Sequence, residues 1–255
     1  NDRFNHECAL ALPEARDEDI EHMRRHYYAK VTTVDEKIGE ILDRLESAGY
    51  LNDAIVIFTS DHGDMLGDHW LPYKWFMYDT VVNVPMIIWD RRHGLGRETA
   101  GTRVDDLASQ IDLGPTILDA AGVDAPRYLE GRSLLAYLDK RPPDPVEYVV
   151  AQDNYMTMLR TERHKLVYYA YQETDGELYD LEEDPDELYN RYSDPGYADV
   201  RRYLMDLLLS WSMRSAYQTA GYKNRDDKTP LFWPQENKYL HHAAVKRPDS
   251  WYARP

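Results

Sequence analysis

Two adjacent side chains that could bind a metal ion, Asp61 and His62, follow an apolar, β-branched stretch, Ala54–Phe58, almost directly. Neighbouring residues of a strand point to opposite faces, so these two can address one point only if the backbone turns. Gly63 supplies the permissive dihedral angles that such a turn often needs. A carboxylate and an imidazole together suit a divalent cation such as Ca²⁺, Mg²⁺, Mn²⁺ or Zn²⁺. The sequence therefore predicts a metal site at the end of a strand.

A lysine in the same loop, Lys74, is the third candidate. An ammonium group beside a metal is suited to stabilise a tetrahedral oxyanion, so we predict that Lys74 binds substrate and assists catalysis. The competing interpretation is that Asp61 caps the turn, His62 packs in the interior and Lys74 is solvated. Gly63 and Gly67 in one loop with Lys74 favour the functional interpretation. Two ligands are too few for a tight site, so further ligands must come from elsewhere.

The elements around these residues indicate an α/β fold. Apolar residues spaced by three and four predict one helix over 18–48. A strand over 54–59 is expected in a sheet that is covered on both faces, and a second strand is expected over 84–89. A helix is predicted over 112–122, opened by an acid and a proline and ended by Gly122.

The chain changes character at the proline-rich stretch 141–145, which predicts a stiff linker. The elements expected after it are short strands at 147–151, 155–160 and 165–171 and a helix over 199–214. The acids within 173–187 are interpreted as a solvated loop. We therefore expect three parts: 1–140, the C-terminal portion of an α/β catalytic domain; 141–221, a smaller α+β subdomain with an antiparallel sheet; and 222–255, an aromatic and proline-containing tail that could contact another subunit.

Composition excludes several classes of function. A net charge of −16 and a pI near 4.9 oppose binding to nucleic acid or to anionic membranes. No stretch approaches the ~20 apolar residues that span a bilayer. A single cysteine, Cys8, weakly favours a reducing compartment, so we expect a cytoplasmic or periplasmic protein, with a slight preference for the cytoplasm. Because the chain begins at Asn1 without an initiator methionine, we also expect that upstream sequence is missing.

Several motifs occur in an order that resembles the sulfatases and the related phosphonate monoester hydrolases of the alkaline phosphatase superfamily. They are residues 59–69 (TSDHGDMLGDH), Lys74, Tyr78-Asp79 and Val84-Pro85, preceded by 28–39 (YAKVTTVDEKIG) and followed by 112–116 (DLGPT), 163–165 (RHK) and 177–187 (ELYDLEEDPDE). The resemblance runs from about residue 27 to 215. It implies an alkaline-phosphatase-like sheet flanked by helices, of which this chain holds the second half.

The resemblance also implies roles for individual residues. It makes Asp61 and His62 metal ligands and Lys74 the residue that contacts the sulfate or phosphonate oxygens. Ca²⁺ is the leading ion, with Mn²⁺ or Zn²⁺ fitting the phosphonate branch. His69 and Asp79 are expected to fix the loop rather than to react, and Asp35 and Asp112 are expected to be structural.

The nucleophile that the resemblance implies is a formylglycine made within a Cys-x-Pro-x-Arg or Cys-x-Ala-x-Arg motif. Cys8 lies in a different context, Glu7 to Leu12 (ECALAL), and is not assigned as nucleophile. We therefore expect the formylglycine in a missing N-terminal half, and expect this fragment to be inactive alone.

Three functions stay open at this point. The favoured one is metal-dependent hydrolysis of a small sulfate ester. The second is hydrolysis of a phosphonate or phosphate ester by the same fold. The third is a catalytically inert relative that serves as a binding domain. The sequence does not distinguish among choline-sulfate, aryl-sulfate and phosphonate-ester substrates.

Overall fold

The computed structural model describes residues 15–92, 100–126, 128–139, 142–153, 155–170 and 176–223, with side chains up to residue 216. Its elements in chain order are α2 (Asp17–Ser47), η1 (Tyr50–Asp53), β1 (Ile55–Thr59), η2 (Asp68–Trp70), α3 (Asp79–Val82), β2 (Met86–Asp90), η4 (Gln110–Asp112), α4 (Leu113–Ala120), α5 (Leu135–Leu138), β3 (Val149–Asp153), β4 (Met156–Arg160), β5 (His164–Tyr169), β6 (Gly176–Asp180), η5 (Pro195–Tyr197) and α6 (Ala198–Lys223). Cys8 and the tail beyond Lys223 lie outside the described residues.

The long helix α2 confirms the predicted helix over 18–48. Three acids in its first turn favour the helix start because they complement the positive end of the helix dipole. Gly49, at φ +78°, adopts the left-handed conformation that commonly ends a helix. No residue of α2 is buried. No helix among the described residues is long and apolar enough to cross a membrane.

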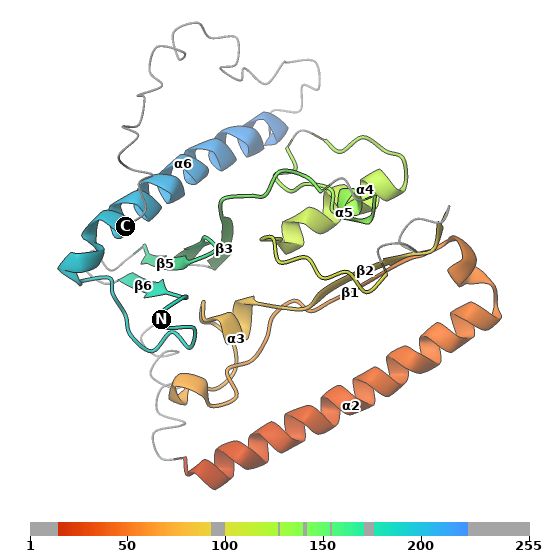
Figure 1. The fold of residues 1–255 in the computed structure, drawn as a ribbon, viewed down its shortest axis with the longest axis horizontal. Helices are drawn as coiled ribbons and strands as arrows, with labels where there is room; N and C mark the ends of the chain where they lie inside the picture. The colour runs from red at the N-terminus through yellow and green to blue at the C-terminus, as the bar shows by residue number, and fades with distance from the viewer. Residues whose placement is uncertain are drawn as a thin grey trace, which may run out of the picture.

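The predicted strands over 54–59 and 84–89 form an antiparallel pair, β1 and β2. Ile55 lies opposite Asp90 and Thr59 opposite Met86. The expectation that β1 lies in a sheet covered on both faces is wrong for the described residues, because β1 pairs with β2 alone and Phe58 is exposed. An apolar sequence shows that a strand can be buried on both faces. In the described residues, however, the side chains of β1 are covered only in part. In Figure 1 the β1–β2 pair lies between α2 and the α4–α5 segment.

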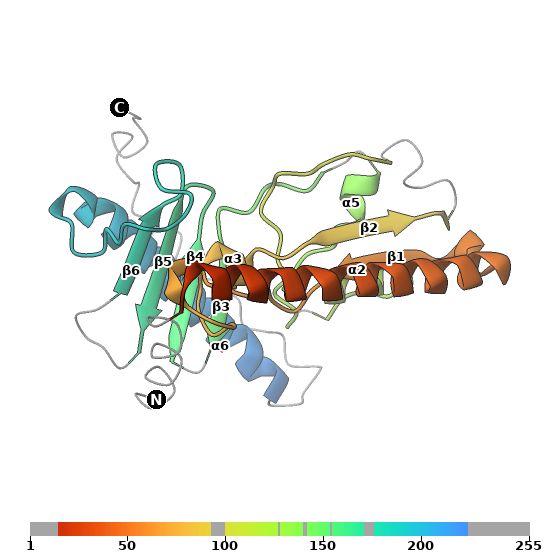
Figure 2. The ribbon, with the colours of Figure 1, turned by 90° about the horizontal axis from the view of Figure 1, so that it is seen from below.

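The second sheet has the strand order β3-β4-β5-β6, antiparallel throughout. Its two faces carry different side chains because neighbouring residues of a strand alternate. One face packs against α6 through a core of Leu159, Leu166, Leu178, Leu204, Leu207 and Leu208. The other face carries Met156, Met158 and Val167, which pack against Met77 from the loop after β1. Figure 2 shows this sheet beyond one end of α2, beside α3.

The acid-rich stretch 173–187 contains strand β6, so the interpretation of it as a solvated loop is wrong. Leu178 and Tyr179 are buried in the sheet. Three acids of the stretch are also buried: Asp180, Asp184 and Glu187. Each accepts hydrogen bonds or pairs with a base, which is why burial is tolerated. The many acids of this stretch suggested a solvated loop and concealed the buried strand within it.

Candidate active site

The turn after β1 brings Asp61 and His62 together. The His62 amide donates to Asp61 Oδ1 at 3.0 Å, and His62 Nε2 lies 3.4 Å from Asp61 Oδ2. The other ring nitrogen, Nδ1, lies 2.6 Å from the Gly63 carbonyl oxygen. A carbonyl only accepts, so Nδ1 carries the proton and Nε2 keeps its lone pair. This is the tautomer that a metal-binding imidazole needs.

The predicted lysine reaches the same point from the far end of the loop. Lys74 Nζ lies 2.6 Å from His62 Nε2, and the ammonium also lies 5.6 Å from the centroid of the Trp75 ring. All three residues predicted from the sequence are thus brought together. They combine a carboxylate, an imidazole nitrogen and an ammonium group, which is a set that can hold a cation and offset the charge of an anion.

The environment keeps the carboxylate of Asp61 charged. Partial desolvation raises the pKa of Asp61. The hydrogen bond from the His62 amide and the nearby charge of Lys74 help to lower it by a larger amount, so the pKa lies below its ordinary value. The Asp61 side chain is 82% exposed, whereas that of His62 is 33% exposed. An anionic carboxylate open to solvent is available to an incoming cation.

The donor set fits a divalent cation only in part. Asp61 and His62 offer one hard oxygen and one imidazole nitrogen. No group of three or more His, Cys, Asp or Glu side chains within the described ranges could hold a metal ion. Zinc takes four ligands and calcium six to eight. Asp61 and His62 would therefore supply two of the ligands, and a cation at His62 Nε2 would replace its hydrogen bond with Lys74.

The loop that carries these residues contains most of the strained backbone. Six non-glycine residues have a left-handed φ in the part of the chain that the structure describes; five of them lie within 66–75, namely Leu66, His69, Trp70, Tyr73 and Trp75. Such conformations cost on the order of 1–3 kcal/mol each and cluster at functional sites. Arg24 of α2 fixes the loop, because its guanidinium donates to Leu66 O at 2.8 Å and to Asp68 Oδ1 at 2.7 Å.

Gly63 is required by a close approach and not by its dihedral angles. Its φ lies outside the left-handed region, which corrects the reason given from the sequence. The Gly63 amide donates to Val81 O at 2.7 Å. A Cβ on this residue would lie 2.0 Å from the Thr80 carbonyl oxygen. The backbone of α3 therefore packs directly on the residue that follows His62.

The two residues expected to fix the loop both make contacts of that kind. His69 stacks on Tyr78, with ring centroids 3.9 Å apart. Asp79 pairs with Lys165, and its Oδ2 lies 3.4 Å from Nη2 of Arg160. Burial raises the pKa of Asp79, but the two bases lower it more, so the pKa lies below its ordinary value.

Of the two acids expected to be structural, Asp112 is buried. Its carboxylate accepts from the Ser109 amide and the Arg132 amide, both at 2.9 Å. These contacts fix the start of α4 and agree with a structural role.

Sequence reasoning assigned no role to two residues behind the site, Lys165 and Glu187, although both stand in motifs that carry the resemblance. Lys165 is completely buried, and its Nζ lies 2.7 Å from Glu187 Oε1. A signal was present, because Lys165 stands two residues before Val167 and so shares its buried face. No such alternation marks Glu187 as buried, because it lies in a loop.

Comparison with known proteins identifies the family. The sulfatase family model matches residues 2–123, and the C-terminal model of N-sulphoglucosamine sulphohydrolase matches residues 67–214. An N-acetylglucosamine-6-O-sulfatase of Bacteroides thetaiotaomicron is 33% identical over 72% of this chain and 34% of its own length.

Two solved structures share the fold. The phosphonate monoester hydrolase of Agrobacterium radiobacter is 30% identical with a TM-score of 0.72, over 81% of this chain and 47% of the other. A protein solved with its substrate D-glucosamine-2-N,6-O-disulfate is 31% identical with a TM-score of 0.65, over 78% and 41%. The chain spans less than half the length of each of these relatives. The ordered motifs, the α/β fold and both family models agree, and the chain belongs to the sulfatase family of the alkaline phosphatase superfamily.

Proposed function

We propose that this chain forms part of an enzyme that hydrolyses a sulfate ester, with Asp61 and His62 as metal ligands and Lys74 as the cation that contacts the sulfate. The observation that carries the proposal is the convergence of Asp61 Oδ2 and Lys74 Nζ on His62 Nε2, at 3.4 and 2.6 Å. Membership of the sulfatase family supports it.

Each residue has a distinct task in this proposal. A divalent cation, with Ca²⁺ as the leading candidate, would withdraw charge from the ester oxygens. Asp61 balances part of the cation charge, and His62 presents Nε2 because Nδ1 is held by Gly63 O. Lys74 offsets the negative charge that develops on the transferred group. The nucleophile, a formylglycine, would come from a part of the enzyme outside this chain.

Sulfated amino sugars are the first substrate class to assay. One relative is named as an N-acetylglucosamine-6-O-sulfatase, and another was solved with a disulfated glucosamine as its substrate. A phosphonate ester is the second candidate, because the phosphonate monoester hydrolase shares the fold at a TM-score of 0.72. Assaying both classes with one enzyme preparation distinguishes the two. A protein that binds metal but turns over neither would instead support an inert binding domain.

The test begins with metal binding. Titration calorimetry with Ca²⁺ or Mn²⁺ on the complete protein should show that Asp61→Asn and His62→Gln each weaken binding by at least tenfold, because each removes a ligand. Asp68→Asn is the matched control, since it removes an acid of the same loop that pairs with Arg24 instead. Unchanged affinity in both ligand variants would refute the assignment.

Lys74 is tested by turnover. Lys74→Met should lower kcat on a sulfate ester by roughly 100-fold or more, as for the loss of one oxyanion stabiliser. Metal stoichiometry should stay unchanged, because an ammonium group does not ligate a cation. A variant with normal kcat would exclude Lys74 from the reaction.

A further inference from the structure

Four charged residues form a cluster behind the site, which we call the Lys165 cluster: Asp79, Arg160, Lys165 and Glu187. Lys165 and Glu187 are buried, and Asp79 and Arg160 are partly buried. Lys165, with no exposed surface, pairs with the Asp79 carboxylate and lies 2.7 Å from Glu187 Oε1. Arg160 Nη2 lies 3.4 Å from Asp79 Oδ2. Two acids and two bases give no net charge, which makes burial of the cluster tolerable. Removing Lys165 would leave the buried carboxylate of Glu187 without its compensating charge.

The cluster joins two separate parts of the chain. Arg160 and Lys165 stand on β4 and β5, on the same face of the sheet as Met158 and Val167. Asp79 is the first residue of α3. Glu187 Oε2 accepts a hydrogen bond from the Asp79 amide at 2.7 Å, so it satisfies one free amide at the start of α3. The C-terminal sheet therefore fixes the position of a helix that belongs to the site loop.

Glu187 is held in this place at a conformational cost. Its φ is +56°, and it is the sixth of the described left-handed non-glycine residues, alone outside the segment 66–75. Its side chain is only 3% exposed. A strained and buried acid persists only where its surroundings determine it. The contacts of Glu187 with Lys165 and with the Asp79 amide hold it in this conformation.

From α3 the contact continues to the metal-ligand turn. Val81 O accepts from the Gly63 amide, and the Thr80 carbonyl leaves no room for a side chain on Gly63. Gly63 O in turn holds Nδ1 of His62. Gly63, which makes both of these contacts, is the residue next to His62, whose imidazole is the proposed ligand. A shift of α3 would thus move or rotate His62.

We propose that the Lys165 cluster is a positioning device, in which the C-terminal sheet orients His62 through Asp79, α3 and Gly63. The effect on His62 as a ligand rests on the proposed function, whereas the effect on the turn does not. The residues of the cluster do not touch the reacting atoms; they act through the backbone of α3.

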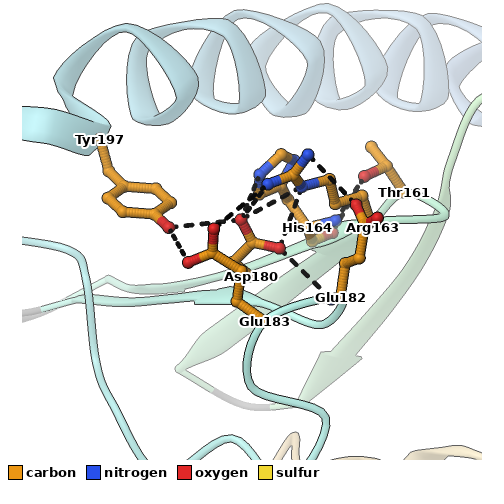
Figure 3. A network of polar contacts seen from close by, with 7 residues as sticks. All are labelled: Thr161, Arg163, His164, Asp180, Glu182, Glu183 and Tyr197. Carbon is orange, nitrogen blue, oxygen red and sulfur yellow. Dashed lines mark hydrogen bonds and ion pairs between the residues drawn. The ribbon is translucent and has the colours of Figure 1, made fainter.

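A second charged network of the same sheet provides the control (Figure 3). Arg163 Nη2 donates to Asp180 Oδ2 at 2.7 Å, and the Tyr197 hydroxyl donates to the same oxygen at 3.3 Å. Asp180 is 2% exposed, so its loss also disturbs a buried pair. The partners of Asp180 come from the β4–β5 turn, β5, the residues after β6, and η5. Asp180 lies on the α6 face of the sheet with Leu178. The two networks thus share strands but face opposite sides.

The experiment compares Lys165→Met with Asp180→Asn in the complete protein. Hydrogen exchange measured by NMR should show that Lys165→Met speeds exchange of the Gly63 amide by about tenfold or more, because its acceptor Val81 O moves. Affinity for Ca²⁺, measured by calorimetry, should fall by on the order of 10–100-fold, as for residues that orient ligands. Asp180→Asn should lower Tm while changing both readouts by less than about twofold.

A charge-balanced variant provides the rescue. Lys165→Met with Glu187→Gln removes one base and one acid and keeps an acceptor for the Asp79 amide. Protection of Gly63 should recover toward that of the unsubstituted protein. If Lys165→Met alone does not fold, the double variant is compared with Asp180→Asn, and Gly63 protection should then be within about threefold of the unsubstituted protein.

Two results would overturn the proposal. One is Gly63 exchange unchanged in Lys165→Met despite a lower Tm; the other is acceleration just as large in Asp180→Asn. Failure of the proposed function looks different: the ligand variants of Asp61 and His62 would leave metal affinity unchanged, while Gly63 exchange would still respond to Lys165→Met.

Discussion

At the scale of single residues, surroundings decide what a histidine does. His62 has its Nδ1 held by a carbonyl, and its Nε2 faces Asp61 and Lys74. His164 is largely buried on β5, with its Nε2 3.6 Å from Asp180 Oδ2. Burial lowers the pKa of His164, and Asp180 opposes this only in part, so the pKa lies below its ordinary value of 6.5. The surroundings of His62 thus fix its tautomer, whereas those of His164 disfavour its charged form.

The lowered pKa of His164 predicts a dependence of stability on pH. The unfolded chain binds a proton near pH 6.5, whereas the folded chain resists protonation until lower pH. The stabilising contribution is therefore complete above pH 6.5 and is lost as the pH falls from there toward the folded pKa. His164→Gln should flatten the fall in unfolding free energy between pH 7.5 and about 5. Urea titrations at several pH values measure this, and parallel curves for the two proteins would contradict it.

At the scale of elements, the turn after β1 packs against α3 because Gly63 has no side chain. The Gly63 amide donates to Val81 O, and the Thr80 carbonyl oxygen lies so close to Gly63 that only glycine fits. A different glycine, Gly39, lies inside α2, and a Cβ added there would have no atom within 4 Å. The same substitution should therefore have opposite effects at the two places.

The matched pair Gly63→Ala and Gly39→Ala tests this. Gly63→Ala should lower the free energy of unfolding by about 1–3 kcal/mol or more, because backbone must move to admit the methyl group. Gly39→Ala should raise it by roughly 0.5–1 kcal/mol, because alanine has the higher helix propensity. Thermal or urea unfolding measures both. Equal effects of the two changes would show that Gly63 has room for a side chain.

Most elements could be predicted from local patterns, because helices and strands repeat the spacing of their apolar residues. The helix α2 and strands β1 to β5 fall close to their predicted ranges. Strand β6 was missed because acids conceal its alternation, and Asp180 is buried only through partners such as Arg163. Asp61, His62 and Lys74 could be singled out because their side-chain types and spacing are visible in the sequence, and the structure brings the three side chains together. Their roles stay a prediction. The Lys165 cluster depends on contacts about 80 to 110 residues apart in the chain, which no local pattern encodes.

At the scale of the whole molecule, burial is uneven. The C-terminal sheet and α6 enclose a leucine core, in which Leu159, Leu166 and Leu178 are fully buried. The N-terminal part, α2 with β1 and β2, exposes apolar side chains to solvent. Val34 and Ile41 of α2 and Ile87 of β2 are each more than half exposed. A two-stranded sheet alone is only marginally stable in water. We therefore expect the N-terminal part of the described chain, α2 with β1 and β2, to be less stable than the C-terminal sheet with α6.

Hydrogen exchange of this chain alone tests the difference. Amides of β4 and β5 should exchange on the order of 100-fold or more slowly than those of β1 and β2, because opening the leucine core requires wider unfolding. Strand amides that pair across each sheet are compared at one pH and temperature. Equal protection in the two sheets would contradict the uneven burial.

The arrangement of β5 also sets what changes of length the chain can accept. His164 and Lys165 are neighbours, yet one faces α6 and the other faces α3. Inserting or deleting one residue early in this strand would exchange the two faces. An ammonium group would then meet leucines, and an imidazole would meet Asp79. Insertions and deletions in related chains should therefore be confined to the connections between strands, while the length and register of β5 stay unchanged.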